Sequence, residues 1–182
     1  PREVRRLLGT FDRRTTAGRR DFAMTLMMVR LGLRAGEVRR LGLDDIDWRA
    51  GELVIRGKGS RVERLPLPTD VGEAVAAYLR RGRPRTAQGR TVFVRVHAPH
   101  GPLSSGAVTD VVCRAARRAG LGLVHAHVLR HTAATQMIRA GAALPEVGQV
   151  LGHRLLFTTA IYAKVDTDGL RVLARRWPGS AA

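Results

Sequence analysis

A single β-hairpin pattern interrupts a chain whose other segments have helical character. Residues 52–56 and 62–67 have strand composition, and Gly57-Lys58-Gly59-Ser60 between them has the composition of a turn. A further short strand is expected at residues 91–96. The sequence therefore predicts a mainly α fold of the α+β class, in which several helices accompany one small three-stranded antiparallel sheet.

Helices are expected on both sides of the hairpin. An apolar face repeats at helical spacing in the segment before it, through Phe22, Leu26, Met27 and Val29. The expected helices span residues 1–8, 17–31, 37–41, 71–81, 106–118, 127–140, 144–151, 158–165 and 169–176. No internal repeat or long linker divides the chain, so residues 1–182 are expected to form one domain.

The net charge indicates the class of partner. Thirty-two Lys and Arg residues against 15 Asp and Glu residues give a net charge of +17, which favours a polyanion, with nucleic acid first and a membrane surface second. The sequence contains no run of 18 apolar residues and no secretion signal, so we expect a cytoplasmic, nucleoid-associated protein. The one cysteine, Cys113, can form neither an internal disulfide nor a multi-cysteine metal site.

Lysine is rare in this basic chain. Only Lys58 and Lys164 occur beside 30 arginines. Arginine keeps its proton under all relevant conditions, whereas lysine can release one when its surroundings lower its pKa. Lys58 also lies between two glycines, which would let a ligand approach the turn closely. Lys58 is therefore a candidate general acid, although a solvated turn lysine would have the same sequence.

Three further segments carry side chains suited to phosphate chemistry. Two arginines can hold the non-bridging oxygens of a phosphodiester, a histidine can donate to them or move a proton, and a tyrosine can attack the phosphorus. The candidates are Arg34 with Glu37 beside it, the run His127-Val128-Leu129-Arg130-His131, His153 and Tyr162. Together with Lys58 they suit cleavage of a phosphodiester without a metal ion.

These residues resemble the catalytic domain of the tyrosine recombinases, the phage-integrase and Xer-like family. The resemblance rests on Leu-Arg-Ala-Gly-Glu at 33–37, Gly-Lys-Gly at 57–59, the run at 127–131, Leu-Gly-His at 151–153 and Thr-Thr-Ala-Ile-Tyr-Ala at 158–163. Their order and spacing match too, with 23 residues from Arg130 to His153 and nine more to Tyr162.

The resemblance implies a role for each matched residue. Tyr162 would form a 3′-phosphotyrosyl link to DNA and free a 5′-hydroxyl, while Lys58 would protonate the leaving oxygen. Arg34, His127, Arg130 and His153 would bind the scissile phosphate, with His127 also assisting proton transfer. Glu37 and His131 are expected to support this site.

The resemblance also implies the partners and the domain content. It implies cleavage and rejoining of double-stranded DNA by a homotetramer on paired sites, with no metal, no nucleotide cofactor, no small-molecule substrate and no membrane. Only 33 residues precede Arg34, so the N-terminal core-binding domain of the family is expected to be absent and residues 1–182 to be the catalytic domain.

Three alternatives remain open at this point. His125, His127 and His131 could bind zinc with one further ligand. A non-catalytic DNA-binding fragment would explain the charge equally well. A type IB topoisomerase would use similar chemistry to relax supercoils without joining two sites.

Overall fold

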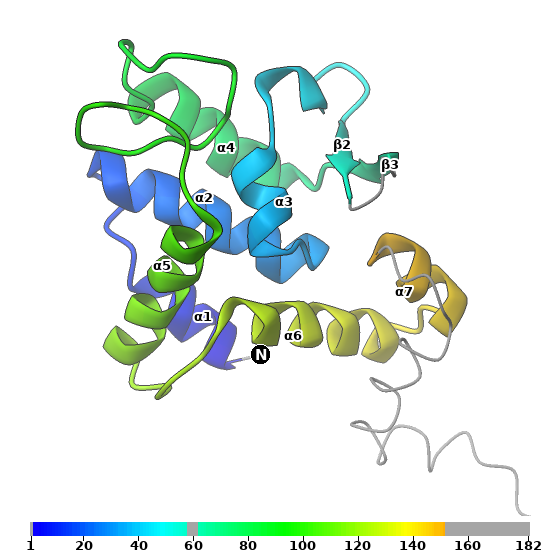
Figure 1. The fold of residues 1–182 in the computed structure, drawn as a ribbon. Coiled ribbons are helices and arrows are strands. Elements are labelled where there is room, and N and C mark those ends of the chain that lie inside the picture. Colours follow the sequence, from blue (N-terminus) through cyan, green and yellow to red (C-terminus); the bar gives the residue numbers. More distant parts are fainter. Residues whose placement is uncertain (1, 58–61, 152–182) are drawn as a thin grey trace, which may run out of the picture. The chain divides into compact units, whose positions relative to one another are not determined.

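The computed structural model describes residues 2–57 and 62–151 (Figure 1). The chain divides into two compact units, residues 1–133 and 134–182, which are considered one at a time below. The helices and strands of the described residues are α1 (Arg2–Gly9), α2 (Thr16–Leu31), α3 (Ala35–Arg40), the 3₁₀ turn η1 (Leu43–Asp45), β1 (Ile46–Asp47), β2 (Glu52–Arg56), β3 (Val62–Pro66), α4 (Thr69–Arg81), α5 (Ser105–Arg118), α6 (Ala126–Arg139) and α7 (Leu144–Val150).

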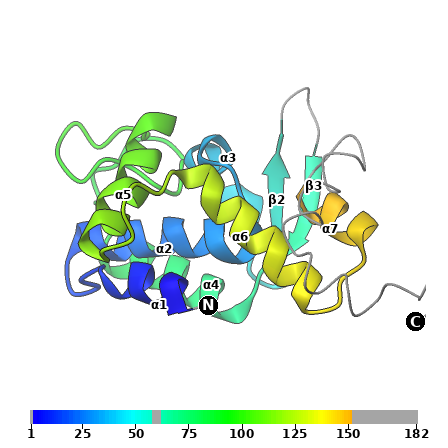
Figure 2. The same ribbon diagram turned by 90° about the horizontal axis from the view of Figure 1, so that it is seen from below.

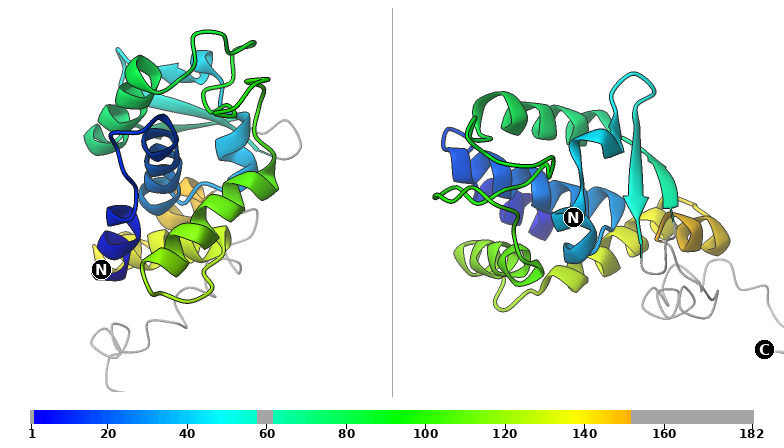
Figure 3. Two further views of the ribbon diagram at one scale, coloured as in Figure 1. Left: turned by 90° about the vertical axis from the view of Figure 1, so that its left-hand side faces the viewer. Right: turned by 45° about the horizontal axis from the view of Figure 1, so that its top comes forward.

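Helix α2 is the centre of the first unit. It contacts α1, α3, α4 and α5, which lie around it in Figures 1 and 3. Seven consecutive residues, 23–29, are buried, so this part of α2 is covered on all sides rather than along one stripe. The turn that follows α2 is consequently fixed by the surrounding helices, and Arg34 lies in that turn.

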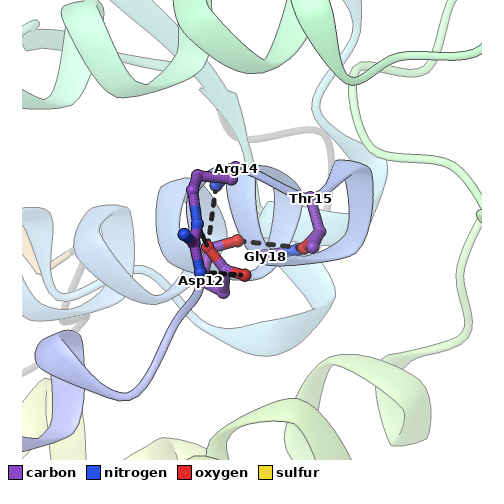
Figure 4. Close-up of polar contacts among 4 residues, drawn as sticks. All are labelled: Asp12, Arg14, Thr15 and Gly18. Carbon is purple, nitrogen blue, oxygen red and sulfur yellow. Dashed lines mark hydrogen bonds and ion pairs between the residues drawn. The ribbon is translucent and has the colours of Figure 1, made fainter.

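The first turn of α2 has a tightly packed cap, drawn in Figure 4. The Thr15 hydroxyl accepts a hydrogen bond from the Gly18 N–H at 3.0 Å and donates to the Asp12 carbonyl at 2.9 Å. The Asp12 carboxylate in turn accepts from the backbone and the guanidinium of Arg14. A Cβ atom at position 18 would overlap the Asp12 carbonyl oxygen, so only glycine fits there.

Gly18→Ala is expected to destabilise the protein by about 1–3 kcal/mol, because the added methyl group forces the cap and the first turn of α2 apart. The free energy of unfolding, measured by urea denaturation, tests this. Gly9→Ala is the matched control, since a Cβ atom there meets nothing within 4 Å. Equal stability of the two variants would show that the cap tolerates the methyl group.

The sheet is antiparallel, with strand order β1-β2-β3. Leu53 of β2 is paired with Ile46 of β1 on one side and with Leu65 of β3 on the other, and all three side chains are buried. Strands β2 and β3 lie side by side in Figure 2. The predicted hairpin is therefore confirmed, and its tip, residues 58–61, lies outside the described residues.

The predicted third strand is wrong in its place. Residues 91–96 form no strand and make only isolated bridges, Gly42 with Thr91 and Val94 with Pro102, while β1 supplies the third strand. Val92, Phe93 and Val94 are apolar because they fill the core, where Phe93 stacks on Tyr78. Three consecutive buried residues have the composition of a strand without being paired as one.

The other helices agree with the sequence prediction to within a few residues at each end. In the second unit, Ala134, Val147 and Leu151 form a small apolar core with Met137 and Ile138 packed against it. The helices predicted at 158–165 and 169–176 lie outside the described residues. The described helices include none with the length and apolar character that a membrane span requires.

Candidate active site

The turn between α2 and α3 holds Arg34 in a defined orientation. Gly32 ends α2 with φ +64°, a left-handed conformation that favours glycine, and Arg34 is the residue just before α3. The Glu37 carboxylate accepts one hydrogen bond from the Arg34 backbone N–H and one from its guanidinium, both at 2.8 Å. The Glu37 side chain is only 7% exposed whereas that of Arg34 is 51% exposed. A buried carboxylate thus fixes an accessible guanidinium.

Arg130 is fixed to the same turn from the other side. It lies on α6 and is buried, and its guanidinium donates to the Gly32 carbonyl oxygen at 2.7 Å. Arg34 follows that carbonyl by two residues, so one short turn positions both arginines although they are far apart in the sequence. Hydrogen bonds of this kind, from a charged donor inside the protein, are among the strong ones.

The two arginines line one open hollow of about 630 Å³ in the first unit. His127 also lines it, three residues before Arg130 and therefore on the same side of α6. The other lining residues are Leu33, Ala35, Gly36, Thr109, His125 and Ala126. The hollow combines two guanidinium groups with an exposed imidazole, a set that can bind and polarise a phosphate group.

Three histidines follow one another beside this hollow. The His127 ring lies 6.0 Å from the His125 ring, nearly parallel to it, and 6.0 Å from the His131 ring, at 76°. Burial is the main cause that lowers the pKa of His131, and the neighbouring charges of His127 and Arg130 lower it further. His131 therefore favours its neutral form, and its ring packs beside His127 without lining the hollow.

The histidines do not assemble a metal site. In the described ranges, no three His, Cys, Asp or Glu side chains are grouped so that they could hold a metal ion. His125 instead has Cys113 as a neighbour, with Nδ1 3.7 Å from Sγ. The zinc alternative, which required His125, His127 and His131 to converge, therefore has no support in this part of the chain.

The structure brings together only some of the predicted site residues. Arg34, His127 and Arg130 line the same hollow. Glu37 accepts a hydrogen bond from Arg34, and the His131 ring packs beside that of His127. Lys58, His153 and Tyr162 lie outside the described residues.

Sequence reasoning missed Thr109 and the Gly32 carbonyl. Thr109 lines the hollow because α5 packs against α3. The Gly32 carbonyl matters because α6 brings Arg130 to it. Gly32 belongs to the turn before Arg34, but the sequence does not show that its carbonyl meets Arg130, and Thr109 belongs to no local motif.

Comparison with known proteins agrees with the resemblance drawn from the motifs. The chain is similar to y4rA of Sinorhizobium fredii, which is named as an integrase/recombinase, with 53% identity over 98% of this chain and 44% of y4rA. It is similar to tyrosine recombinase XerC of Oceanobacillus iheyensis, with 34% identity over 93% of this chain and 57% of XerC. The chain thus spans about half the length of these relatives.

A solved structure and a family model are both consistent with the relatives found by sequence. The structure resembles the crystal structure of XerA recombinase with a TM-score of 0.83 and 25% identity, over 96% of this chain and 62% of XerA. This match confirms the predicted fold class, that of a tyrosine recombinase catalytic domain. The model of the phage integrase family matches residues 1–168. On these grounds, the chain belongs to the phage integrase family.

Proposed function

We propose that this chain is the catalytic domain of a site-specific DNA recombinase or integrase, which cleaves and rejoins double-stranded DNA through a covalent link at Tyr162. The observation that carries the proposal is the meeting of Arg34, His127 and Arg130 around one hollow, with both arginines tied to the turn after α2. The family match over residues 1–168 supports the assignment of the chain to one catalytic domain. The net charge of +17 supports DNA as the partner.

The proposed cleavage step conserves the energy of the broken bond. The Tyr162 oxygen bonds to the scissile phosphorus, the bond from phosphorus to the 5′-oxygen breaks, and Lys58 gives a proton to that oxygen. Arg34, Arg130 and His153 hold the non-bridging oxygens as charge develops on them, and His127 assists in moving the phenol proton. Attack by a 5′-hydroxyl on the phosphotyrosine reverses the step. Guanidinium, imidazole and ammonium groups thus supply the charge and the protons, so the proposal includes no metal or cofactor.

We also propose that four such domains act together. Exchange between two duplexes cuts four strands, and each domain contributes one tyrosine.

A nicked suicide substrate, from which the released strand diffuses away, tests the proposed cleavage directly: the protein should accumulate as a covalent DNA adduct on a denaturing gel. Joining of two separate DNA sites, rather than relaxation of a supercoiled plasmid alone, would distinguish a recombinase from a type IB topoisomerase.

Lys58→Arg should slow cleavage strongly although it keeps the positive charge, because arginine is a poor proton donor. A substrate with a 5′-phosphorothiolate leaving group should restore the rate, since sulfur leaves without protonation. Single-turnover cleavage of both substrates measures this effect. Absence of rescue would assign Lys58 a role other than general acid.

Glu37→Gln should lower the cleavage rate by about 10- to 100-fold, because it removes a charge-assisted hydrogen bond that orients Arg34. Affinity for the DNA site, measured by fluorescence anisotropy, should change little. Glu73→Gln, which alters an exposed acid of α4 outside the hollow, is the matched control. Parallel losses of affinity and rate would show that Glu37 acts on binding instead of orientation.

A further inference from the structure

A second hollow of the first unit lies between α2 and α4 and shares no residue with the candidate active site. Its volume is about 870 Å³, compared with about 630 Å³ at Arg34. We call it the α2–α4 groove, and it is lined by Arg13, Arg14, Arg19, Phe22, Leu26, Asp70, Glu73, Ala74, Ala77, Arg80 and Arg81. None of these residues has a part in the proposed DNA chemistry.

The two ends of the groove differ in charge. Helices α2 and α4 lie side by side (Figure 3). Two contacts show that they run in opposite directions: the Arg19 guanidinium donates to the Arg81 carbonyl at one end, and Arg30 pairs with Asp70 at the other. Of the five lining arginines, Arg13 and Arg14 precede α2, Arg19 lies in its first turns, and Arg80 and Arg81 end α4, while Asp70 and Glu73 lie near the start of α4. One end is therefore basic and the other end is acidic.

The floor of the groove is apolar. Phe22 and Leu26 lie one turn apart on α2, opposite Ala74 and Ala77 of α4, whose small side chains leave the space open. The Arg13 guanidinium lies over the face of the Phe22 ring, 4.9 Å from its centroid, so a cation borders the apolar floor. A floor of this composition fits apolar side chains inserted from a partner, as when an amphipathic helix binds in a groove.

Not all the groove arginines are neutralised by the residues that the structure describes. The Arg14 pair with Asp12 is exposed to solvent, with Arg14 92% exposed, and such pairs exchange easily for others (Figure 4). In the described part of the chain, the guanidinium groups of Arg80 and Arg81 have no hydrogen-bond or ion-pair partner. The basic end therefore offers several cations to a ligand of opposite charge.

Within residues 2–57 and 62–151, the acidic residues do not supply a fitting occupant. The densest acidic stretch of the sequence, Asp44 to Asp47, is already engaged, because Asp44 pairs with Arg90 and Asp45 with Arg56. DNA fits the groove less well than a protein does. The carboxylates of Asp70 and Glu73 repel phosphate groups, and the apolar side chains of the floor cannot form hydrogen bonds with them.

We infer that the α2–α4 groove docks an acidic amphipathic helix of a partner protein. The apolar stripe of that helix lies on Phe22, Leu26, Ala74 and Ala77, and its acidic residues lie toward Arg80 and Arg81. Charge complementarity sets the direction and the specificity, while the apolar contacts supply most of the affinity. Such a partner would bind away from Arg34 and leave the candidate active site accessible.

The test uses a fluorescein-labelled synthetic helix with a leucine stripe flanked by glutamates, and fluorescence anisotropy as the readout. Arg80→Gln combined with Arg81→Gln should weaken binding of this helix by about tenfold. Ala77→Glu, which places a carboxylate on the floor, should weaken it at least as much. Arg49→Gln combined with Arg85→Gln is the matched control, because it removes the same charge at exposed positions outside the groove.

Several outcomes would overturn the inference. The first is that the synthetic helix does not bind the unaltered protein. The second is that the control variant loses as much affinity for the helix as the groove variant, which would show only long-range electrostatic attraction. Equal affinity for a helix with serines in place of the leucines would show that the floor is not used. If Ala77→Glu weakened the binding of a duplex oligonucleotide as strongly as it weakened the binding of the helix, the groove would be a DNA-binding surface. The double Arg→Gln variant changes only exposed side chains, so its result holds even if Ala77→Glu lowers the stability.

Discussion

Tyr162→Phe should abolish the covalent adduct with nicked DNA, because phenylalanine has no oxygen with which to attack phosphorus. The hydroxyl is one small group on a strongly basic chain, so DNA binding should remain nearly intact. Adduct formation is measured on a denaturing gel, and binding by fluorescence anisotropy. This is the largest effect expected for any single substitution in the chain.

Tyr78→Phe is the matched control, since Tyr78 is the only other tyrosine in the sequence. Its ring is fully buried and stacks on Phe93, with ring centroids 5.5 Å apart, and its hydroxyl accepts a long hydrogen bond of 3.4 Å from the Val94 N–H. The control should form the adduct at the normal rate. An adduct that persists in Tyr162→Phe would move the nucleophile to another residue.

The second large effect is expected for Arg130→Lys. Lysine keeps the charge, but one ammonium group cannot both donate to the Gly32 carbonyl and hold a phosphate as a guanidinium does. The cleavage rate should fall by about 10²–10³, the usual cost of losing one donor to a developing oxyanion. Single-turnover cleavage at saturating protein separates this loss from any change in affinity.

Arg117→Lys is the control for Arg130→Lys, because Arg117 is exposed on α5 and lies outside the hollow. The midpoint of thermal unfolding shows whether each variant is folded. A folded Arg130→Lys variant that cleaves DNA as fast as the unaltered protein would contradict the assignment of Arg130 to the phosphate.

The sequence predicts the local features of this fold better than its pairings. The hairpin follows from two short apolar segments around a glycine-rich turn, and β2 spans the predicted residues 52–56. The third strand was misplaced because Val92, Phe93 and Val94 are buried by tertiary packing, while the two-residue strand β1 is too short to leave a pattern. Burial and strand pairing give the same composition in a short segment.

The same distinction applies to the site. Arg34 and Arg130 could be proposed from their motifs, and the hollow contains both. That Arg130 is anchored to the Gly32 carbonyl, two residues before Arg34, could not be predicted, because it depends on where α6 passes the end of α2. Thr109 is hidden for the same reason, since its place depends on how α5 packs on α3.

The short turn after α2 restricts how related chains can vary in length. One residue inserted between Gly32 and Arg34 would lengthen the link between the anchor of Arg130 and the backbone that carries Arg34, and so disturb both arginines at once. The irregular segment 85–89, which precedes the buried run of Val92, Phe93 and Val94, is mostly exposed. Insertions and deletions should therefore accumulate in that segment during evolution and be rare in the turn.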